Sequence, residues 1–428
     1  MNERPVAGID ISKRFSDLCI LAPNNTVICE TKIYHDLTSM NRAVEKLQAA
    51  KDTYGESPVI VMESTAHYHR ILHQFLTSAG FEVLLINPLQ SSTIKNIGIR
   101  RIKSDKADAK KLALLYRLKV LHSSNFDNSI TNVLKDLTRQ RIDLISERVR
   151  YINKLGALLD QAFPGYSKVF PQIKGKSSLA ILARFPTPEA ILGARKDTLR
   201  KVIGEACGRG KDSIFAHKKA DALKKIAAEA QQICMCRTSF NILISMTAAM
   251  LNTIQASAEN LKNEIMRLAM ADSNIKSNVA LLTSIPGIGD YSAVVILSEI
   301  SDISLFSNPK QLVAFCGLDP TVRQSGSFVG THNRISKRGS SYLRWVLNLC
   351  THVAVHPGKN KVSANTVLCS YFTKKCESKP PKVALCACMH KMVNIIFAVL
   401  RDQKPFELRL PEEHIRLMKT RKATDKAA

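Results

Sequence analysis

The sequence lacks long hydrophobic runs and a hydrophobic leader. No stretch of its 428 residues approaches the roughly 18 consecutive apolar residues that a membrane-spanning helix needs. Its N-terminus, Met1 to Pro5, has no apolar core of the kind that a secretory signal contains. We therefore expect a cytoplasmic protein without membrane association, whose 11 cysteines are reduced thiols.

The cysteines also lack the spacing of a zinc site. Cys234 and Cys236, like Cys386 and Cys388, are separated by a single residue, whereas paired zinc ligands usually have at least two between them. No internal repeat or low-complexity tract is apparent. A structural zinc site is therefore not expected.

Acidic side chains are scarce relative to basic ones. The chain has 62 Lys and Arg against 36 Asp and Glu, a formal net charge of +26. Such a charge attracts nucleic acid and makes binding salt-dependent, although ribosomal and membrane-surface proteins share the property. A hydrophobic content of 45% is sufficient for proper cores, and this length predicts two to four domains.

Two carboxylates follow apolar runs near the N-terminus. Asp10 comes after Val6 to Ile9, and Glu63 comes after Val59 to Met62. Each run reads as a buried strand that delivers an acid at its tip. Strand tips can converge even when they are distant in sequence.

Two further acids, Asp105 and Asp108, open a helical pattern that continues through Tyr116. Their spacing of three places them on one helix face. An oxygen-rich group of this kind suits Mg²⁺ or Mn²⁺, and two such ions about 4 Å apart can hold both oxygens of a phosphoryl transfer. The alternative is structural: Asp105 caps its helix and Asp108 offsets the neighbouring lysines.

The coarse pattern changes near residue 128. Residues 1–128 alternate strands and helices, which predicts an α/β domain with a mixed sheet. Strands are expected near 6–11, 17–22, 27–33, 58–62 and 82–86, and helices near 37–51, 66–79 and 105–118.

Residues 129–275 favour long helices with coiled-coil seams. One seam runs from Thr138 to Leu159 through Ile145, Val149 and Ile152, and a second runs from Leu251 to Leu268. Each seam fits either an antiparallel hairpin within the chain or an oligomer, and its length slightly favours some contact between chains. Between them, Gly208 to Lys211 reads as a flexible basic loop.

Two features stand out after residue 276. Gly287 and Gly289 in Pro-Gly-Ile-Gly resemble a helix-hairpin-helix turn, whose backbone N–H groups can approach a phosphate, although a plain interhelical turn has the same pattern. Ser325 precedes a glycine and is followed by four cations that could hold phosphates: Arg334, Lys337, Arg338 and Arg344. Taken alone, a Ser-Gly pair usually marks a turn.

The ordered set of motifs over residues 5–355 resembles the recombinases of insertion-sequence family 110/1111, relatives of the pilin DNA invertase Piv. The carboxylates match within Gly-Ile-Asp-Ile-Ser, Val-Met-Glu-Ser-Thr and Lys-Ser-Asp-Lys-Ala-Asp-Ala. The later matches are Ile-Pro-Gly-Ile-Gly, Gly-Leu-Asp-Pro, Gln-Ser-Gly and Ser-Lys-Arg-Gly. Two departures are Ser340, where the family usually has Asn, and Ser327, a second hydroxyl near Ser325.

The resemblance implies three parts. They are a RuvC-like, ribonuclease-H-like domain at 1–128 with a DEDD metal tetrad, coiled-coil helices at 129–275, and a mainly helical transposase domain with a catalytic serine at 276–355. Residues 356–428 extend past the matching motifs and have no assigned role, and we expect a helical extension with a basic tail there. The resemblance also implies excision and insertion of a mobile element, with DNA as substrate and a structured guide RNA. Because exchange of DNA ends requires at least two active sites held together, we also expect a homo-oligomer, either a dimer or a tetramer. Other readings are a metal-dependent endonuclease of the Holliday-junction-resolvase kind and a non-catalytic architectural protein that binds nucleic acid.

Overall fold

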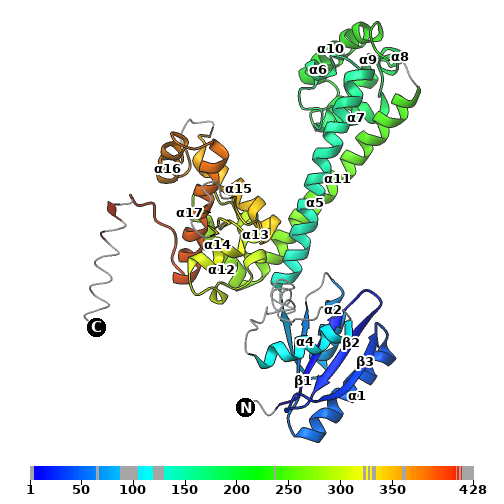
Figure 1. Ribbon diagram of the computed structural model, residues 1–428. Coiled ribbons are helices and arrows are strands. Elements are labelled where there is room, and N and C mark those ends of the chain that lie inside the picture. The colour runs from blue at the N-terminus through cyan, green and yellow to red at the C-terminus, as the bar shows by residue number, and fades with distance from the viewer. Residues whose placement is uncertain are drawn as a thin grey trace. The chain divides into compact units, whose positions relative to one another are not determined.

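The structure is a computed structural model that divides into two compact units, Met1–Asp127 and Asn128–Ala428 (Figure 1). It describes residues 4–63, 67–86, 105–118, 130–235, 238–321, 324–325, 328–329, 334–358, 363–410, 412–413 and 416. At positions 105, 106, 238, 324, 325, 328 and 329 it describes only the backbone.

The first unit contains a five-stranded mixed sheet in the order β3-β2-β1-β4-β5. The central strand β1 pairs antiparallel with β2 and parallel with β4. This confirms the predicted α/β domain. The strands are β1 (Val6–Ile11), β2 (Phe15–Leu21), β3 (Val27–Tyr34), β4 (Val59–Glu63) and β5 (Glu82–Ile86), and the helices are α1 (Leu37–Tyr54), α2 (His69–Ser78) and α4 (Asp105–Arg117).

Helices cover both faces of this sheet. Ile9 and Met62 belong to a core with α1 and α2, whereas Val6 and Val61 belong to a core with α4. Because successive side chains of a strand point to opposite faces, Asp10 shares the α4 face with Val6, and Glu63 shares it with Val61.

Gly8 allows α4 to approach β1 closely. A methyl group at Gly8 would lie 1.9 Å from the carbonyl oxygen of Ala109 and 2.8 Å from the amide nitrogen of Ala113. Only a residue without a side chain leaves room for the helix backbone at this position. The contact sets the depth at which the first turns of α4 lie on the sheet.

The second unit is built around two long helices, α5 (Ile130–Ala162) and α11 (Thr238–Ala271), which lie side by side (Figure 1). The end of α5 packs with the start of α11, and the start of α5 packs with the end of α11, so the pair is antiparallel. Arg141 Nε donates across the pair to the carbonyl of Ala258 at 2.9 Å. Of the two arrangements open to the seams, the structure contains the hairpin within one chain.

Between α5 and α11 lies a helical lobe, defined here as residues 163–235, that the sequence analysis had included in one coiled-coil segment. Its side chains form a separate core together with the adjoining ends of the long helices. Its helices are α6 (Tyr166–Val169), α7 (Lys176–Arg184), α8 (Pro188–Gly193), α9 (Lys196–Ala206) and α10 (Ile214–Gln231).

The chain then forms a C-terminal module around one continuous core. Because α15 and α17 share this core, it has no break at the predicted boundary after residue 355. Its elements are α12 (Ser273–Thr283), α13 (Asp290–Ile300), η1 (Ile303–Leu305), α14 (Pro309–Phe315), β6 (Gln324–Ser325), β7 (Phe328–Val329), α15 (Ser341–Val355), α16 (Thr366–Cys376) and α17 (Pro381–Asp402).

One described helix, α17, is long and apolar enough to cross a membrane by length and composition. Half of its most apolar stretch is buried inside the protein. Core helices of soluble proteins pass the same test, and α17 supplies Met392, Ile396 and Phe397 to the core of the module.

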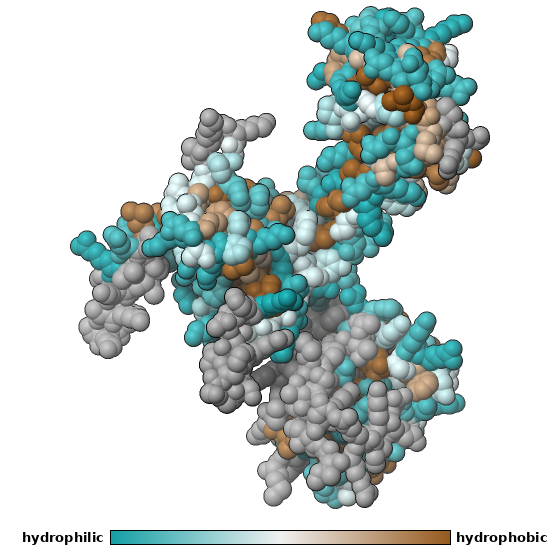
Figure 2. All heavy atoms as spheres, turned by 45° about the horizontal axis from the view of Figure 1, so that its top comes forward, coloured by the Kyte–Doolittle hydropathy of each residue, from teal (hydrophilic) through white to brown (hydrophobic). Residues whose placement is uncertain are grey.

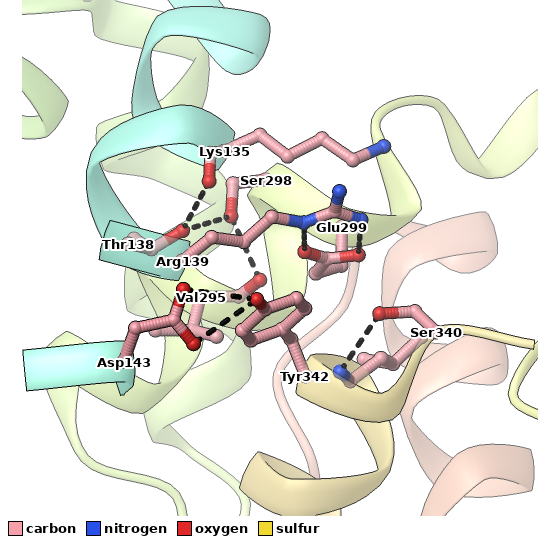
Figure 3. Close-up of polar contacts among 10 residues, drawn as sticks. Lys135, Thr138, Arg139, Asp143, Val295, Ser298, Glu299, Ser340 and Tyr342 are labelled. Atoms are coloured by element: carbon pink, nitrogen blue, oxygen red, sulfur yellow. Dashed lines mark hydrogen bonds and ion pairs between the residues drawn. The ribbon is translucent and has the colours of Figure 1, made fainter. Parts of the chain in front are cut away.

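A polar cluster joins α5 to this module (Figure 3). Arg139 donates to both carboxylate oxygens of Glu299 at 2.6 and 2.9 Å, and these bonds raise the pKa of the guanidinium. Thr138 and Ser298 share a hydrogen bond of 3.3 Å, and the Tyr342 hydroxyl donates to Asp143 at 3.1 Å. Since α5, α13 and α15 each contribute, the cluster fixes the module against the long helix.

We predict that Gly8→Ala destabilises the first unit by about 1 to 3 kcal/mol, because the added methyl must push α4 away from β1. Urea unfolding followed by circular dichroism measures the loss. Gly193→Ala is the control, since nothing lies within 4 Å of a methyl there. Equal stability of Gly8→Ala and the wild type would contradict the close approach.

The Arg139 and Glu299 pair gives a second prediction. Arg139→Met leaves the Glu299 carboxylate, which is 1% exposed, without its cation and should cost about 3 kcal/mol. Adding Glu299→Met should recover most of that loss, because apolar replacement of a whole buried pair is often neutral. Urea midpoints that are equally low in the single and double variants would contradict this account.

Candidate active site

Asp10 and Glu63 lie next to each other at one edge of the sheet. Ile9 pairs with Met62 in the parallel β1 and β4 ladder, so the residues that follow them occupy the next register position. Asp10 is half-buried and Glu63 is 9% exposed. Both side chains are on the face that α4 covers, as the strand alternation requires. The predicted convergence of two strand tips is therefore seen in the backbone.

The first turn of α4 brings Asp108 to the same face. Asp108 directly precedes Ala109, whose carbonyl contacts Gly8. The Asp108 side chain is 14% exposed, and its Oδ1 accepts a hydrogen bond from Lys111 Nζ at 3.0 Å. Asp105 is the first residue of the helix, and its side chain lies outside the described part of the chain.

A further carboxylate, Asp17, was missed by the sequence analysis. Asp17 pairs with Asp10 across β1 and β2 and is 3% exposed. Directly opposite residues of an antiparallel pair share a face, so Asp17, Asp10 and Glu63 form a row across three neighbouring strands. Asp17 opens the strand that the sequence predicts at 17–22, but strand pairing was needed to place it beside Asp10.

The chemistry of these donors suits a hard divalent ion, because carboxylate oxygens are the ligands that Mg²⁺ and Mn²⁺ prefer. As the side chains stand, no three His, Cys, Asp or Glu in the described ranges form a group that could hold one ion. Asp105, the fourth predicted ligand, is outside that search because its side chain is not described.

Ser325 lies in a two-stranded hairpin of the second unit. Strand β6 pairs antiparallel with β7, with Ser325 opposite Phe328. The connecting residues Gly326 and Ser327, and the side chain of Ser325, are outside the described part of the chain. The structure thus places the Ser325 backbone at the closed end of a hairpin.

The base of this hairpin is held by a ladder of hydrogen bonds between residues 317–321 and 334–339. Thr321 N donates to Arg334 O at 2.7 Å, and Ser336 N donates to Asp319 O at 2.8 Å. The Ser336 hydroxyl also donates to Asp319 Oδ1 at 2.5 Å. The Gly-Leu-Asp-Pro and Ser-Lys-Arg-Gly motifs therefore form one structural element.

Two glycines let these motifs touch. Gly317 has φ of +64°, and a methyl group on it would lie 2.7 Å from Gly339 N. A methyl group on Gly339 would lie 1.7 Å from the carbonyl oxygen of Phe315. Arg344 Nη1 donates to the carbonyls of Cys316 and Gly339 at 3.1 and 2.6 Å, which ties both sides together.

The predicted phosphate-binding cations therefore differ in their surroundings. Arg334, Lys337 and Arg338 are exposed, whereas Arg344 is half-buried and bonded to main-chain carbonyls. Ser340, the departure from the family pattern, caps α15 by accepting a hydrogen bond from Leu343 N at 3.2 Å. Asn and Ser are similarly good helix caps, which accounts for the exchange.

The Pro-Gly-Ile-Gly turn connects α12 to α13. Gly287 has φ of +105°, and a methyl group on it would lie 2.7 Å from both Ala354 Cβ and Cys350 O of α15. Packing thus explains this glycine without a phosphate. Gly289 is the N-cap of α13 and is exposed. Nothing lies within 4 Å of a methyl group added to it, and Asp290 occupies the first turn of the helix.

Comparison with known proteins identifies two domains. Residues 7–164, which include the four predicted carboxylates, match the IS110-type DEDD transposase domain. Residues 279–365, which include Ser325, match the domain of the transposase IS116/IS110/IS902 family.

Several curated relatives are similar over part or all of the chain. An uncharacterized 44.8 kDa protein of insertion element IS116 from Streptomyces clavuligerus is 23% identical over 95% of this chain and 96% of its own length. The pilin gene-inverting protein of Moraxella bovis is 30% identical over 36% of this chain and 47% of its own. The transposase for insertion sequence element IS1111A of Coxiella burnetii is 31% identical over 29% of this chain and 33% of its own. The chain carries both domains of the IS116/IS110/IS902 transposases and belongs to that family.

Proposed function

We propose that the chain is a DNA recombinase that cuts and rejoins strands through a covalent bond to Ser325, assisted by Mg²⁺ or Mn²⁺ on Asp10, Glu63, Asp105 and Asp108. The observation that carries this proposal is the placement of Asp10 and Glu63 on neighbouring strands, on the sheet face that α4 covers. A five-stranded mixed sheet with acids on β1, on β4 and at the start of the covering helix supports a RuvC-like domain.

Ser325 would act as the nucleophile. Its hydroxyl oxygen attacks a DNA phosphorus, the bond from phosphorus to one strand breaks, and that strand leaves as a hydroxyl end. The serine proton passes to a carboxylate or to water, and the leaving oxygen takes up a proton. The bound divalent ion would supply the positive charge that activates a weak hydroxyl and stabilises the phosphoryl oxygens.

Rejoining is the reverse step on another strand. The hydroxyl of a second DNA end attacks the phosphoserine, a phosphodiester forms, and the serine oxygen is released and protonated. Because the ester conserves the energy of the broken phosphodiester, no nucleotide cofactor is required. Because the serine hydroxyl is weak until a metal ion activates it, one enzyme would need both a serine and a carboxylate domain.

The exposed cations after Ser325 would position the DNA backbone. Arg334 and Lys337 lie on the ladder that carries the hairpin, so a phosphate held there stays close to the serine segment. Arg344 would contribute indirectly, by holding Gly339 against Cys316. The N–H groups following Gly289 are a further candidate contact, since the helix N-terminus favours an anion.

Assembly and guidance complete the proposal. Exchanging DNA ends needs at least two active sites, and α11 exposes a line of apolar side chains, Ile242, Met246 and Met250, which supports contact with a second copy.

The net charge of +26 supports binding a structured RNA of the element that selects DNA by base pairing. We place this activity in the cytoplasm.

Two other functions use the same residues differently. A resolvase-type endonuclease would cut with the tetrad alone and leave no protein on the DNA. An architectural protein would bind DNA without cutting it. Strand rejoining separates the recombinase from the endonuclease, and metal-dependent nicking separates both enzymes from the architectural protein.

We predict that Asp10→Ala lowers the cleavage rate by more than about a hundredfold. Losing a residue that only supports a metal ligand already lowers activity by up to about a hundredfold. DNA binding and its salt dependence should remain, because Lys and Arg contacts to phosphate are separate from metal chemistry. Single-turnover cleavage with Mg²⁺ and fluorescence anisotropy measure the two effects.

Asp52→Ala is the matched control for this prediction, because Asp52 is an exposed acid in α1 of the same unit. It should cleave like the wild type. Full recombination by Asp10→Ala in Mg²⁺ would contradict the proposed metal site.

The Ser325 assignment predicts a trapped intermediate. With a nicked suicide DNA substrate, the wild type should form a protein–DNA adduct that survives denaturation and requires divalent metal. Ser325→Ala should form none, because no other atom at that position can make the ester, whereas Ser327→Ala should still form it. Denaturing gels and peptide mapping report the result, and an adduct mapped to Ser327 would overturn the assignment.

A further inference from the structure

The helical lobe of residues 163–235 lies almost entirely outside the two matched family domains, which cover residues 7–164 and 279–365. It carries 14 Lys and Arg but only 6 Asp and Glu. Most of the lobe surface visible in Figure 2 is hydrophilic. A dense excess of one charge disfavours folding through self-repulsion, so it indicates a polyanionic partner.

Two basic segments of the lobe come together in space. The Ser177 hydroxyl, in the first turn of α7, donates to the carbonyl of Ile203 near the end of α9 at 3.0 Å. The next residue, Gly204, contacts the α9 to α10 loop so closely that a methyl group on it would lie 2.0 Å from Gly210 O. These contacts bring Lys174 and Lys176 near Arg209 and Lys211.

The loop after α9, which the sequence predicts to be basic and flexible, is held by hydrogen bonds in the structure. Gly208 and Gly210 have φ of +70° and +77°, which glycine adopts without strain. Arg209 N donates to Gly204 O at 3.0 Å, and the Ser213 hydroxyl donates to Gly210 O at 2.9 Å. These contacts hold the backbone from which Arg209 and Lys211 project.

The four cations are all exposed. Two carboxylates are close in sequence: Glu205, whose Oε1 lies 3.9 Å from Lys201 Nζ, and Asp212. The surface therefore keeps a local positive excess. Its chemistry fits phosphodiester groups, which are spaced regularly and need no specific side-chain partner.

We propose that Lys174, Lys176, Arg209 and Lys211 form a second nucleic-acid surface, which binds the phosphate backbone at a distance along the chain from the serine hairpin. This inference rests on the proposed function to the extent that the enzyme works on nucleic acid. It assigns the lobe the role of holding a polynucleotide without reading its sequence.

The test measures how salt weakens binding of the full chain with all four residues changed to Ala. Without divalent metal, anisotropy is recorded with a mixed-sequence DNA duplex and with an RNA hairpin. The slope of log K against log salt should become shallower by about 2 to 4, since each lost phosphate contact removes about 0.9 on duplex DNA and about 0.7 on single strands. The probe whose slope falls identifies the nucleic acid that the lobe holds.

A matched control removes the same charge elsewhere in the lobe, by changing to Ala three residues at the opposite ends of α7 and α9 and one within α10: Arg184, Arg195, Lys196 and Lys225. This control should keep the wild-type slope. A charge-retaining variant, K174R, K176R, R209K and K211R, should also keep it, which separates a binding defect from a folding defect.

Wild-type slopes for the four-alanine variant on both probes would overturn the proposal. An equal loss in the matched control would also overturn it, because the effect would then be one of diffuse net charge. Because no strand is cut in these measurements, failure of the proposed recombination would show in cleavage assays and leave the slopes interpretable.

Discussion

The close approach of α4 to β1 at Gly8 is the constraint on which the candidate metal site depends. The strands alone place Asp10 and Glu63 side by side, whereas the first turn of α4, which carries Asp108, packs on the same face because its backbone lies where a side chain at residue 8 would normally be. The second unit uses the same device, since Gly317 and Gly339 let the two motifs around Ser325 touch. Within each unit, backbone contacts at glycines therefore position the segment that carries the candidate functional residues.

The antiparallel pair of α5 and α11 has the C-terminal module at one end and the helical lobe at the other. The bidentate Arg139 and Glu299 pair fixes α5 to α13, and Tyr342 with Asp143 fixes it to α15, which begins just after the Ser-Lys-Arg-Gly motif. Contacts of α15 thus stabilise the segment next to the serine hairpin. The lobe packs on the other end of α5 and α11.

The sequence predicted those elements whose signals are local. The strands at 6–11 and 82–86 lie where the apolar runs put them, and both long helices follow their apolar spacing. The remainder depended on non-local pairing. Asp17 gained significance only from its register with Asp10, and the seam of α5 gained its partner only when α11 returned along it.

Single-residue roles were harder to predict for the same reason. Arg344 has the chemistry of a phosphate ligand, but the tertiary contact with Cys316 and Gly339 occupies one of its nitrogens. Gly287 fits a phosphate-binding turn, but the approach of α15 explains it equally well. A motif predicts which residue type stands at a position. The group that this residue contacts depends on packing between segments that are distant in sequence.

The stereochemistry of strand transfer at phosphorus tests the central claim most directly. A DNA substrate with one chiral phosphorothioate at the exchanged position would be recombined, and the configuration of the product determined. Attack by a serine followed by attack of a DNA hydroxyl inverts phosphorus twice, so the account predicts net retention. Net inversion would mean a single direct displacement and would contradict a covalent serine intermediate.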